Sequence, residues 1–335
     1  MRTIIKGIGS YLPERIVSSE EIEERIGFEK FHIRKGMIKI FTGVMLRRYA
    51  GEEQQASDMA AMAAQKAIEN AGMRPKDIDV LIYTAITQDF AEPATANVVQ
   101  HKIGATNAVC FDVKNACNAF LNGMDLGDSI IKAGKGKTVL VTAGEVLSRM
   151  VRFDYDDPEL IKKRCATFSV GDGGGAFVLS ASDTENGISR IEFKSLGDYW
   201  MHNVIWGGGV MYPRDPDKFC LTGDTNELLR LHFEYTMDFY KNSMEKSGWP
   251  THEIKLVIPS QITKYLAIKT IEKLEISADK LVDILTEFGN IGAASIPVAM
   301  CLAVDEGLMQ QGQKNKLMLF GAASGLSLGC ICVEY

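Results

Sequence analysis

Residues 56–82 read ASDMAAMAAQKAIENAGMRPKDIDVLI, and this stretch decides the fold. Apolar and small residues recur at helical spacing over 56–71, which predicts a helix that ends at Gly72. A proline then marks a turn, and the apolar run at 80–82 predicts a short strand buried on both faces of a sheet. The stretch is therefore one helix-to-strand unit.

A second copy of this unit follows later in the chain. A helical pattern through residues 228–244 ends at Gly248, and an apolar strand follows at 254–258. Both the glycine and the strand lie 176 residues after their counterparts in the first unit. A shared spacing, with the same residues ending the helix before the strand, indicates a duplication rather than coincidence.

The duplication predicts two α/β halves whose sheets pair across a pseudo-twofold axis. We expect the first half to span residues 1–182 and the second to span residues 183–335. The join is expected in the polar stretch 182–187, which follows an apolar strand and contains turn residues. A site at the axis would take residues from both halves.

Composition excludes several classes of protein. The net charge of −6 and the absence of a basic stripe argue against a nucleic-acid partner. No stretch reaches the roughly 18 apolar residues of a membrane span, and the first residues do not resemble a secretory signal, so we expect a cytoplasmic protein. Seven cysteines without a CxxC pair fit neither a disulfide framework nor a zinc site.

Cys117 is the cysteine in the most favourable place for chemistry. Residues 111–113 read as the end of a strand, and apolar residues follow Cys117 at helical spacing, so the thiol is expected at or near a helix start. Free N–H groups and the helix dipole would lower the thiol pKa from about 8.5. The alternative is an inert buried thiol, which we expect of Cys110, Cys301 and Cys330.

Three motifs make the chain similar to a known family. They are DVKNAC at 112–117, GDGGGA at 171–176 and FGNIGAASIP at 288–297. With them the chain resembles β-ketoacyl-acyl-carrier-protein synthase III and its relatives in the thiolase superfamily, from residue 7 to the last strand. The resemblance implies a thiolase-like duplicated α/β fold, a layered α-β-α-β-α sandwich, with neither a metal nor a permanently bound cofactor.

The resemblance also implies a reaction. Cys117 would be the nucleophile that takes an acyl group from coenzyme A. Asn290 and a histidine would hold the carbonyl oxygen of a malonyl thioester while it loses carbon dioxide and attacks. An enolate oxygen of this kind needs fixed hydrogen-bond donors, each worth roughly 3 to 4 kcal/mol.

The sequence departs from the family at that histidine. Residues 259–263 read PSQIT, which places Ser260 at the histidine position. A serine donates one hydrogen bond but does not act as a base near pH 7. None of the five histidines lies in a motif that replaces it, and His232, on the repeated helix, is expected to be a surface or core residue.

A second departure lies near the C-terminus. The family's run of glycines becomes GAASGLS at 321–327, where Gly321 and Gly325 remain. A backbone N–H of this loop would join that of Cys117 in an oxyanion hole.

Four further residues match family positions less specifically. Phe90 matches a phenylalanine of the acyl pocket and dimer interface, although a plain core aromatic is the alternative. Arg164 matches a residue that binds coenzyme A. Met37 and Phe41 stand where a tryptophan and an arginine of the nucleotide site would be expected, so we expect nucleotide binding to be reduced or rearranged.

Two hypotheses follow. The first is an acyltransferase or condensing enzyme of fatty-acid or specialised metabolism, with an acyl thioester on Cys117. Its second half-reaction would be altered, as a condensation without malonyl decarboxylation or as transfer to another acceptor, with Ser260 and Asn290 at the site. Its substrates would be acyl-coenzyme A or acyl-carrier-protein thioesters, and it would form a homodimer or a heteromeric complex. The second hypothesis is a non-catalytic thiolase-fold subunit that scaffolds an active partner.

Overall fold

The computed structural model describes residues 2–184 and 186–335. One sheet has the strand order β1-β7-β6-β4-β5, in which β4 is parallel to β5 and β6 while β7 is antiparallel to β6 and β1. Every residue of β4 is buried, as the apolar run predicted. The strands are β1 (Arg2–Tyr11), β4 (Val80–Thr84), β5 (Val109–Val113), β6 (Thr138–Val146) and β7 (Asp172–Ser182).

The other large sheet repeats this topology. Its order is β8-β11-β10-β9, with β9 parallel to β10 and with β11 antiparallel to β10 and β8. Val80 pairs with Val139 in the first sheet, and Leu256 pairs with Leu317 in the second. The strands are β8 (Gly187–Ser195), β9 (Ile254–Pro259), β10 (Lys316–Ala323) and β11 (Ser327–Glu334).

Repeated strand order and register confirm the duplicated α/β fold. An isolated parallel bridge between Val257 and Leu281 stands where β5 stands beside β4. The division of the chain at residues 182 and 183 stays a prediction: β7 ends at Ser182 and β8 begins at Gly187, while Glu185, within the predicted join, lies outside the described residues.

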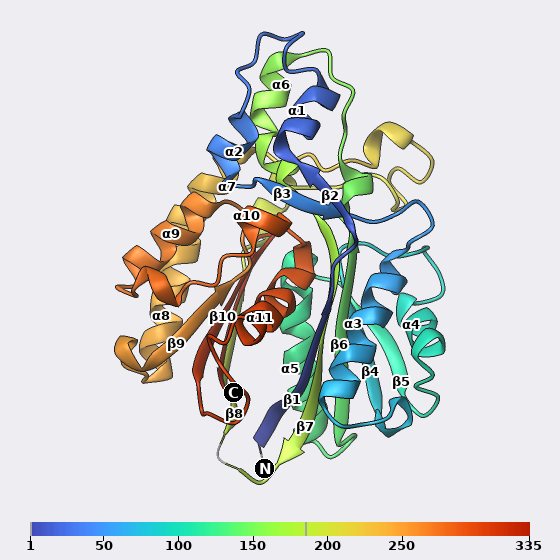
Figure 1. Ribbon diagram of the computed structural model, residues 1–335, viewed down its shortest axis with the longest axis vertical. Coiled ribbons are helices and arrows are strands. Elements are labelled where there is room, and N and C mark those ends of the chain that lie inside the picture. Colours follow the sequence, from blue (N-terminus) through green and yellow to red (C-terminus); the bar gives the residue numbers. More distant parts are fainter. Residues whose placement is uncertain (1, 185) are drawn as a thin grey trace.

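The helices form layers around the two sheets (Figure 1). Two helices pack between the sheets, α5 on β6, β4 and β11 and α11 on β1, β7 and β9. Helices α3 and α4 cover the outer face of the first sheet, and α8 and α9 cover that of the second. The layers confirm an α-β-α-β-α sandwich. The bounds are α3 (Ala56–Asn70), α4 (Thr95–Ile103), α5 (Ala119–Lys132), α8 (Met237–Ser247), α9 (Lys264–Lys273) and α11 (Ser295–Asp305).

The small elements gather at one end of the sandwich, at the top of Figure 1. This is the end toward which the parallel strands point with their carboxyl termini, where ligands of such sheets commonly bind. Among the described helices none is both long and apolar enough to cross a membrane. The elements are α1 (Ser19–Ile26), α2 (Met37–Thr42), α6 (Pro158–Lys163), α7 (Thr225–Leu231), α10 (Leu285–Phe288), β2 (Arg15–Ser18) and β3 (Leu46–Tyr49).

Close backbone packing explains glycines at two positions. A Cβ on Gly9 of β1 would lie 2.3 Å from the Ala63 carbonyl oxygen, and one on Gly174 of β7 would lie 2.1 Å from the Met59 carbonyl oxygen. Both carbonyls belong to α3. The alanine-rich α3 therefore lies directly on the sheet, because neither surface carries a bulky side chain there.

The helix predicted through residues 228–244 is interrupted. Helix α7 ends at Leu231, a π-turn spans His232–Thr236, and α8 follows. A π-turn inserts one extra residue and so changes the direction of the side chains that follow. The regular 3.6-residue pattern of the sequence could not show this insertion.

Candidate active site

Cys117 lies in a 3₁₀ turn, Ala116–Asn118, between β5 and α5. The thiol therefore stands just before the helix, close to where the sequence predicted it. The preceding residue, Ala116, has a φ of 48°, in the left-handed region that alanine rarely adopts. Strain of this kind costs about 1 to 3 kcal/mol and is concentrated at functional sites. The strained backbone of Ala116 is part of the turn that holds Cys117.

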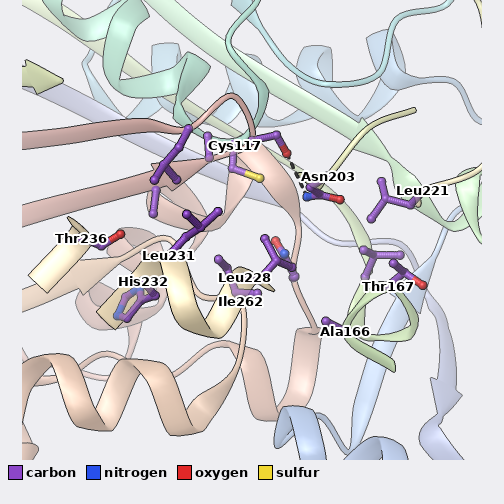
Figure 2. Close-up of a pocket in the computed structure, with 16 residues that line it drawn as sticks. Cys117, Ala166, Thr167, Asn203, Leu221, Leu228, Leu231, His232, Thr236 and Ile262 are labelled. Carbon is purple, nitrogen blue, oxygen red and sulfur yellow. Dashed lines mark hydrogen bonds between the residues drawn. The ribbon is translucent and has the colours of Figure 1, made fainter. Parts of the chain in front are cut away.

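Cys117 lines two cavities. The narrow cavity, of about 60 Å³, has mainly apolar walls, among them Leu228, Leu231 and Ile262 (Figure 2). The wide cavity, of about 720 Å³, is bounded by the loops at 86–91 and 200–209. Asn290 lines both cavities as well. The half-buried thiol and the amide are thus brought together from the two halves of the chain.

The pKa of Cys117 contradicts the sequence-based expectation. Burial, with a smaller contribution from the negative charge of Glu145, raises the pKa of the thiol to about 12, and a backbone N–H only partly opposes them. The sequence indicated the nearby helix start but neither the depth of the site nor a carboxylate 28 residues away in the chain. In the unliganded protein Cys117 is therefore a thiol at neutral pH.

Glu145 is a buried acid at the end of β6. Its carboxylate accepts hydrogen bonds from the N–H groups of Ile86 (2.9 Å), Thr87 (3.1 Å) and Ala293 (3.1 Å), and from the Thr87 hydroxyl (2.9 Å). Burial raises its pKa to about 7 against the effect of these donors. The Ala293 bond also connects the first half to the loop that carries Asn290.

The alkylation rate of Cys117 should report this environment. We expect the rate constant with iodoacetamide to rise about tenfold per pH unit from pH 7 to 10 without a plateau, because the thiolate fraction grows in this way below the thiol pKa. Glu145→Gln should raise the rate at pH 8, since it removes a negative charge near the sulfur. Peptide mass spectrometry resolves Cys117 from the other cysteines. A plateau near pH 7 would show that the thiol is activated instead.

Asn290 is fixed by bonds on both sides of its backbone. Its N–H donates to the Ser169 carbonyl (2.9 Å), its carbonyl accepts from Gly171 (3.0 Å), and its Oδ1 accepts from the N–H of Gly292 (2.9 Å). Because Oδ1 is used inside the loop, the side-chain NH₂ is the group left to donate into the cavities.

Ser260 is a buried residue beside the second sheet. It follows β9, is 8% exposed, and its N–H donates to the Phe320 carbonyl at 2.6 Å. Its Oγ has no hydrogen-bond partner among the described residues. Ser260 lines a third cavity, of about 10 Å³, rather than either cavity at Cys117. A common site with Cys117 and Asn290 stays a prediction.

His232, which was expected to be a surface or core residue, is buried and also lines a cavity at Cys117. This is the narrow cavity, which Cys117 and Asn290 line as well (Figure 2). In that view Leu231 lies between His232 and Cys117. No pattern in the sequence indicated this placement, because it depends on how the helical segment that ends α7 packs in the fold.

The two glycines of the predicted oxyanion loop have different surroundings. Gly325 lines the wide cavity with φ at 129°, in the region that favours glycine. Gly321 lies within β10, where a Cβ would come 2.0 Å from Oδ1 of the buried Asn118. Asn118 donates to the Ser327 hydroxyl (3.1 Å), which also accepts from Asn115 (3.0 Å). This contact gives Gly321 a packing role, and a part in an oxyanion hole stays a prediction.

We therefore expect Gly321→Ala to destabilise the protein by about 1 to 3 kcal/mol through overpacking against Asn118. Urea unfolding measures the loss. Asn118→Ala has its own cost, but the double variant should lose less than the sum of the two single variants, because the colliding amide is absent. Strict additivity would contradict the contact.

The remaining predicted residues are Phe90, Met37, Phe41 and Arg164. Phe90 lines the wide cavity and is 41% exposed. Met37 begins α2 and packs against the core, Phe41 is exposed on the same helix, and Arg164 ends α6. The latter three lie outside the linings of both Cys117 cavities, as far as the described residues show. Their coenzyme A site stays a prediction.

Asn203 is a cavity residue that the sequence did not indicate. It lines both Cys117 cavities, and its Nδ2 donates to the Ser324 hydroxyl at 2.9 Å, the dashed line in Figure 2. It comes from a loop without a motif, so only the fold brings it to Cys117. Glu145 carried a weak signal, as an acid after an apolar strand.

Two family models match the chain. The model of 3-oxoacyl-[acyl-carrier-protein (ACP)] synthase III matches residues 111–197, and the model of its C-terminal part matches residues 244–335. The first segment contains Cys117, and the second contains Ser260 and Asn290.

Curated relatives match over nearly the whole chain. The beta-ketoacyl-[acyl-carrier-protein] synthase III of Clostridium perfringens strain SM101 is 30% identical over 334 residues, which cover 98% of each chain. The protein of the same name from Neisseria meningitidis serogroup A is 32% identical over 333 residues, covering 99% of this chain and 98% of that one.

Solved structures share the fold. The 3-oxoacyl-[acyl-carrier-protein] synthase III of Aquifex aeolicus superposes with a TM-score of 0.87 at 28% identity, covering 99% of this chain and 100% of the other. A single-residue variant of the OleA protein of Xanthomonas campestris gives a TM-score of 0.88 at 25% identity, covering 100% of this chain and 98% of the other.

Proposed function

This chain belongs to the 3-oxoacyl-[acyl-carrier-protein] synthase III family, which makes it a condensing or acyl-transferring enzyme, and from this premise we propose that its acyl group is carried on Cys117. The observation that supports the proposal is the position of the thiol. It stands in a strained turn and lines two cavities that Asn290 also lines. A carrier thiol needs room on both sides, one for the acyl chain and one for the thioester arm that delivers or receives it.

The first half-reaction is a thioester exchange. The Cys117 sulfur attacks the carbonyl carbon of an acyl thioester, a new C–S bond forms, and the donor thiol leaves with the proton that Cys117 loses. The N–H of Cys117 and an N–H of the Gly325 turn would hold the oxyanion. Because the free thiol has a high pKa, thiolate formation is coupled to substrate binding.

The second half-reaction is proposed to be altered. The Asn290 amide can donate to an acceptor's carbonyl oxygen, whereas the Ser260 hydroxyl lies in a separate small cavity. Loss of one of two oxyanion donors costs about 3 to 4 kcal/mol, or 10² to 10³ in rate. Decarboxylation of a malonyl thioester, which builds up enolate charge, would suffer most. We therefore propose a condensation without decarboxylation or transfer to another acceptor.

Partners and location remain part of the proposal. Acyl-coenzyme A or an acyl carrier protein would deliver the thioester, with no cofactor bound permanently. A homodimer is supported by the open edge of the first sheet, where Val109 of β5 is 68% exposed. A cytoplasmic location is supported by the cysteines, all seven of which are free thiols in a pattern that suits a reducing compartment.

A panel of acyl-coenzyme A thioesters tests the proposal. Intact-mass measurement should show a single adduct of the mass of one acyl group, and the panel ranks the acyl chains that the wide cavity accepts. The same acyl groups on a carrier protein distinguish the two kinds of donor. If no donor of either kind modifies the protein, the non-catalytic scaffold becomes the better account.

A further inference from the structure

His232 and Ser260 belong to different elements but line one small cavity, which we call the histidine cavity. His232 opens the π-turn between α7 and α8, and Ser260 follows β9. Both residues are 8% exposed. Helix α9 contributes Thr270 to the same cavity. The side chains of His232, Ser260 and Thr270 therefore face one enclosed space.

Thr270 determines which nitrogen of His232 carries the proton. Its hydroxyl donates to the Leu266 carbonyl at 2.8 Å, and its Oγ1 lies 2.8 Å from Nε2 of His232. A hydroxyl has one proton; with that proton assigned to the Leu266 carbonyl, Nε2–H is the donor of the second bond. Burial lowers the pKa of His232 to about 4, which keeps the ring neutral. Nδ1 is then a bare acceptor.

Ser260 supplies the complementary donor. Its hydroxyl is buried and without a partner among the described residues, although buried hydroxyls are normally hydrogen-bonded. The histidine cavity measures about 10 Å³, about the space that one water molecule requires. A buried water also requires two to four polar partners. Ser260, His232 and Tyr240 all line the cavity.

We propose that one buried water links the Ser260 hydroxyl to Nδ1 of His232, so that the two residues act as a single polar unit. The hydroxyl donates to the water, and the water donates to Nδ1. His232 is then a positioning residue, which orients the hydroxyl through the water. Because His232, Ile262 and Ala322 line both the histidine cavity and the narrow cavity, this unit lies in their common wall. The inference does not depend on the reaction at Cys117.

Long-range ¹H–¹⁵N spectra of protein labelled with ¹⁵N-histidine test the tautomer. His232→Gln identifies the signals of this ring among the five histidines. We expect a protonated Nε2 and a bare Nδ1 from pH 5.5 to 8. Ser260→Ala, which removes one partner of the water, should shift the Nδ1 signal and leave the tautomer unchanged. The matched control is Ser243→Ala, another buried serine, whose hydroxyl donates to Glu192 instead.

Either of two results would overturn the proposal. One is a ring that is charged, or protonated on Nδ1, at pH 7. The other is an Nδ1 signal that does not respond to Ser260→Ala, or that responds equally to Ser243→Ala.

Substitutions at positions 260 and 232 test whether Ser260 and His232 share one space. An imidazole at position 260 would compete with His232 for a cavity that holds a single water. Ser260→His alone should lower the urea midpoint, and adding His232→Ala should recover at least half of the loss, with His232→Ala alone as the matched single variant. A double variant that folds where Ser260→His does not counts as recovery. An unchanged midpoint in Ser260→His, or no recovery, would contradict the shared space.

Discussion

Cys117→Ala is expected to abolish the covalent acyl adduct and to slow turnover by about 10³-fold or more, because no other group replaces a lost nucleophile. Cys117 lines both site cavities. Intact mass after incubation with the best acyl donor measures the adduct, and thiol release from the donor measures turnover.

Cys110→Ala is the matched control for this experiment. Cys110 is also a half-buried free thiol, but it lies within β5, where its Sγ contacts Asn97 at 3.3 Å. The adduct should form on this variant as on the unchanged protein. If the adduct persists in Cys117→Ala and is lost in Cys110→Ala, the acyl group is carried at a site other than Cys117.

Asn290→Leu is expected to slow the second half-reaction by about 10² to 10³, the usual cost of one oxyanion donor. Acylation of Cys117 should change by less than about threefold, because that step uses backbone donors near the sulfur. Rapid-mixing measurements that follow adduct formation and adduct consumption separately give the two rates.

Asn290→Asp distinguishes donation from loop structure. An aspartate keeps the oxygen that accepts from Gly292 but cannot donate. If the donor matters, both variants lose the second half-reaction. If only the loop matters, Asn290→Asp keeps it. The added negative charge is also expected to slow acylation by disfavouring the thiolate, so the two steps must be measured apart.

The sequence predicted the architecture because duplication leaves a pattern in the chain itself. The separation between Gly72 and Gly248 equals that between the strands near Val80 and Leu256. In the structure these two strands belong to two sheets of matching register. Local motifs also placed Cys117 at a helix entrance. Each of these features depends on residues close together in the chain or on a repeat, which the sequence displays directly.

The chemistry of the site could not be predicted as well, because it depends on contacts between distant residues. Glu145 comes near Cys117 only when β6 and the turn before α5 pack together, and it helps to raise the thiol pKa rather than lower it. His232 lines the cavity only because of how the end of α7 packs in the fold. The cavity that Ser260 lines is likewise formed by segments that are distant in the chain.

The carboxyl of Glu145 gives folding itself a dependence on proton concentration. Its pKa rises from 4.5 in the unfolded chain to about 7 in the folded protein, so the folded form holds its proton longer. Below pH 4.5 Glu145 is protonated in both the folded and the unfolded chain, so it does not change the free energy of unfolding with pH. Between pH 4.5 and 7 the unfolded chain ionises first, and the free energy of unfolding falls by about 3 kcal/mol. The buried carboxyl that joins the two halves therefore makes the folded protein more stable in mildly acidic solution than at pH 7. Urea midpoints measured across this pH range should fall as the pH rises.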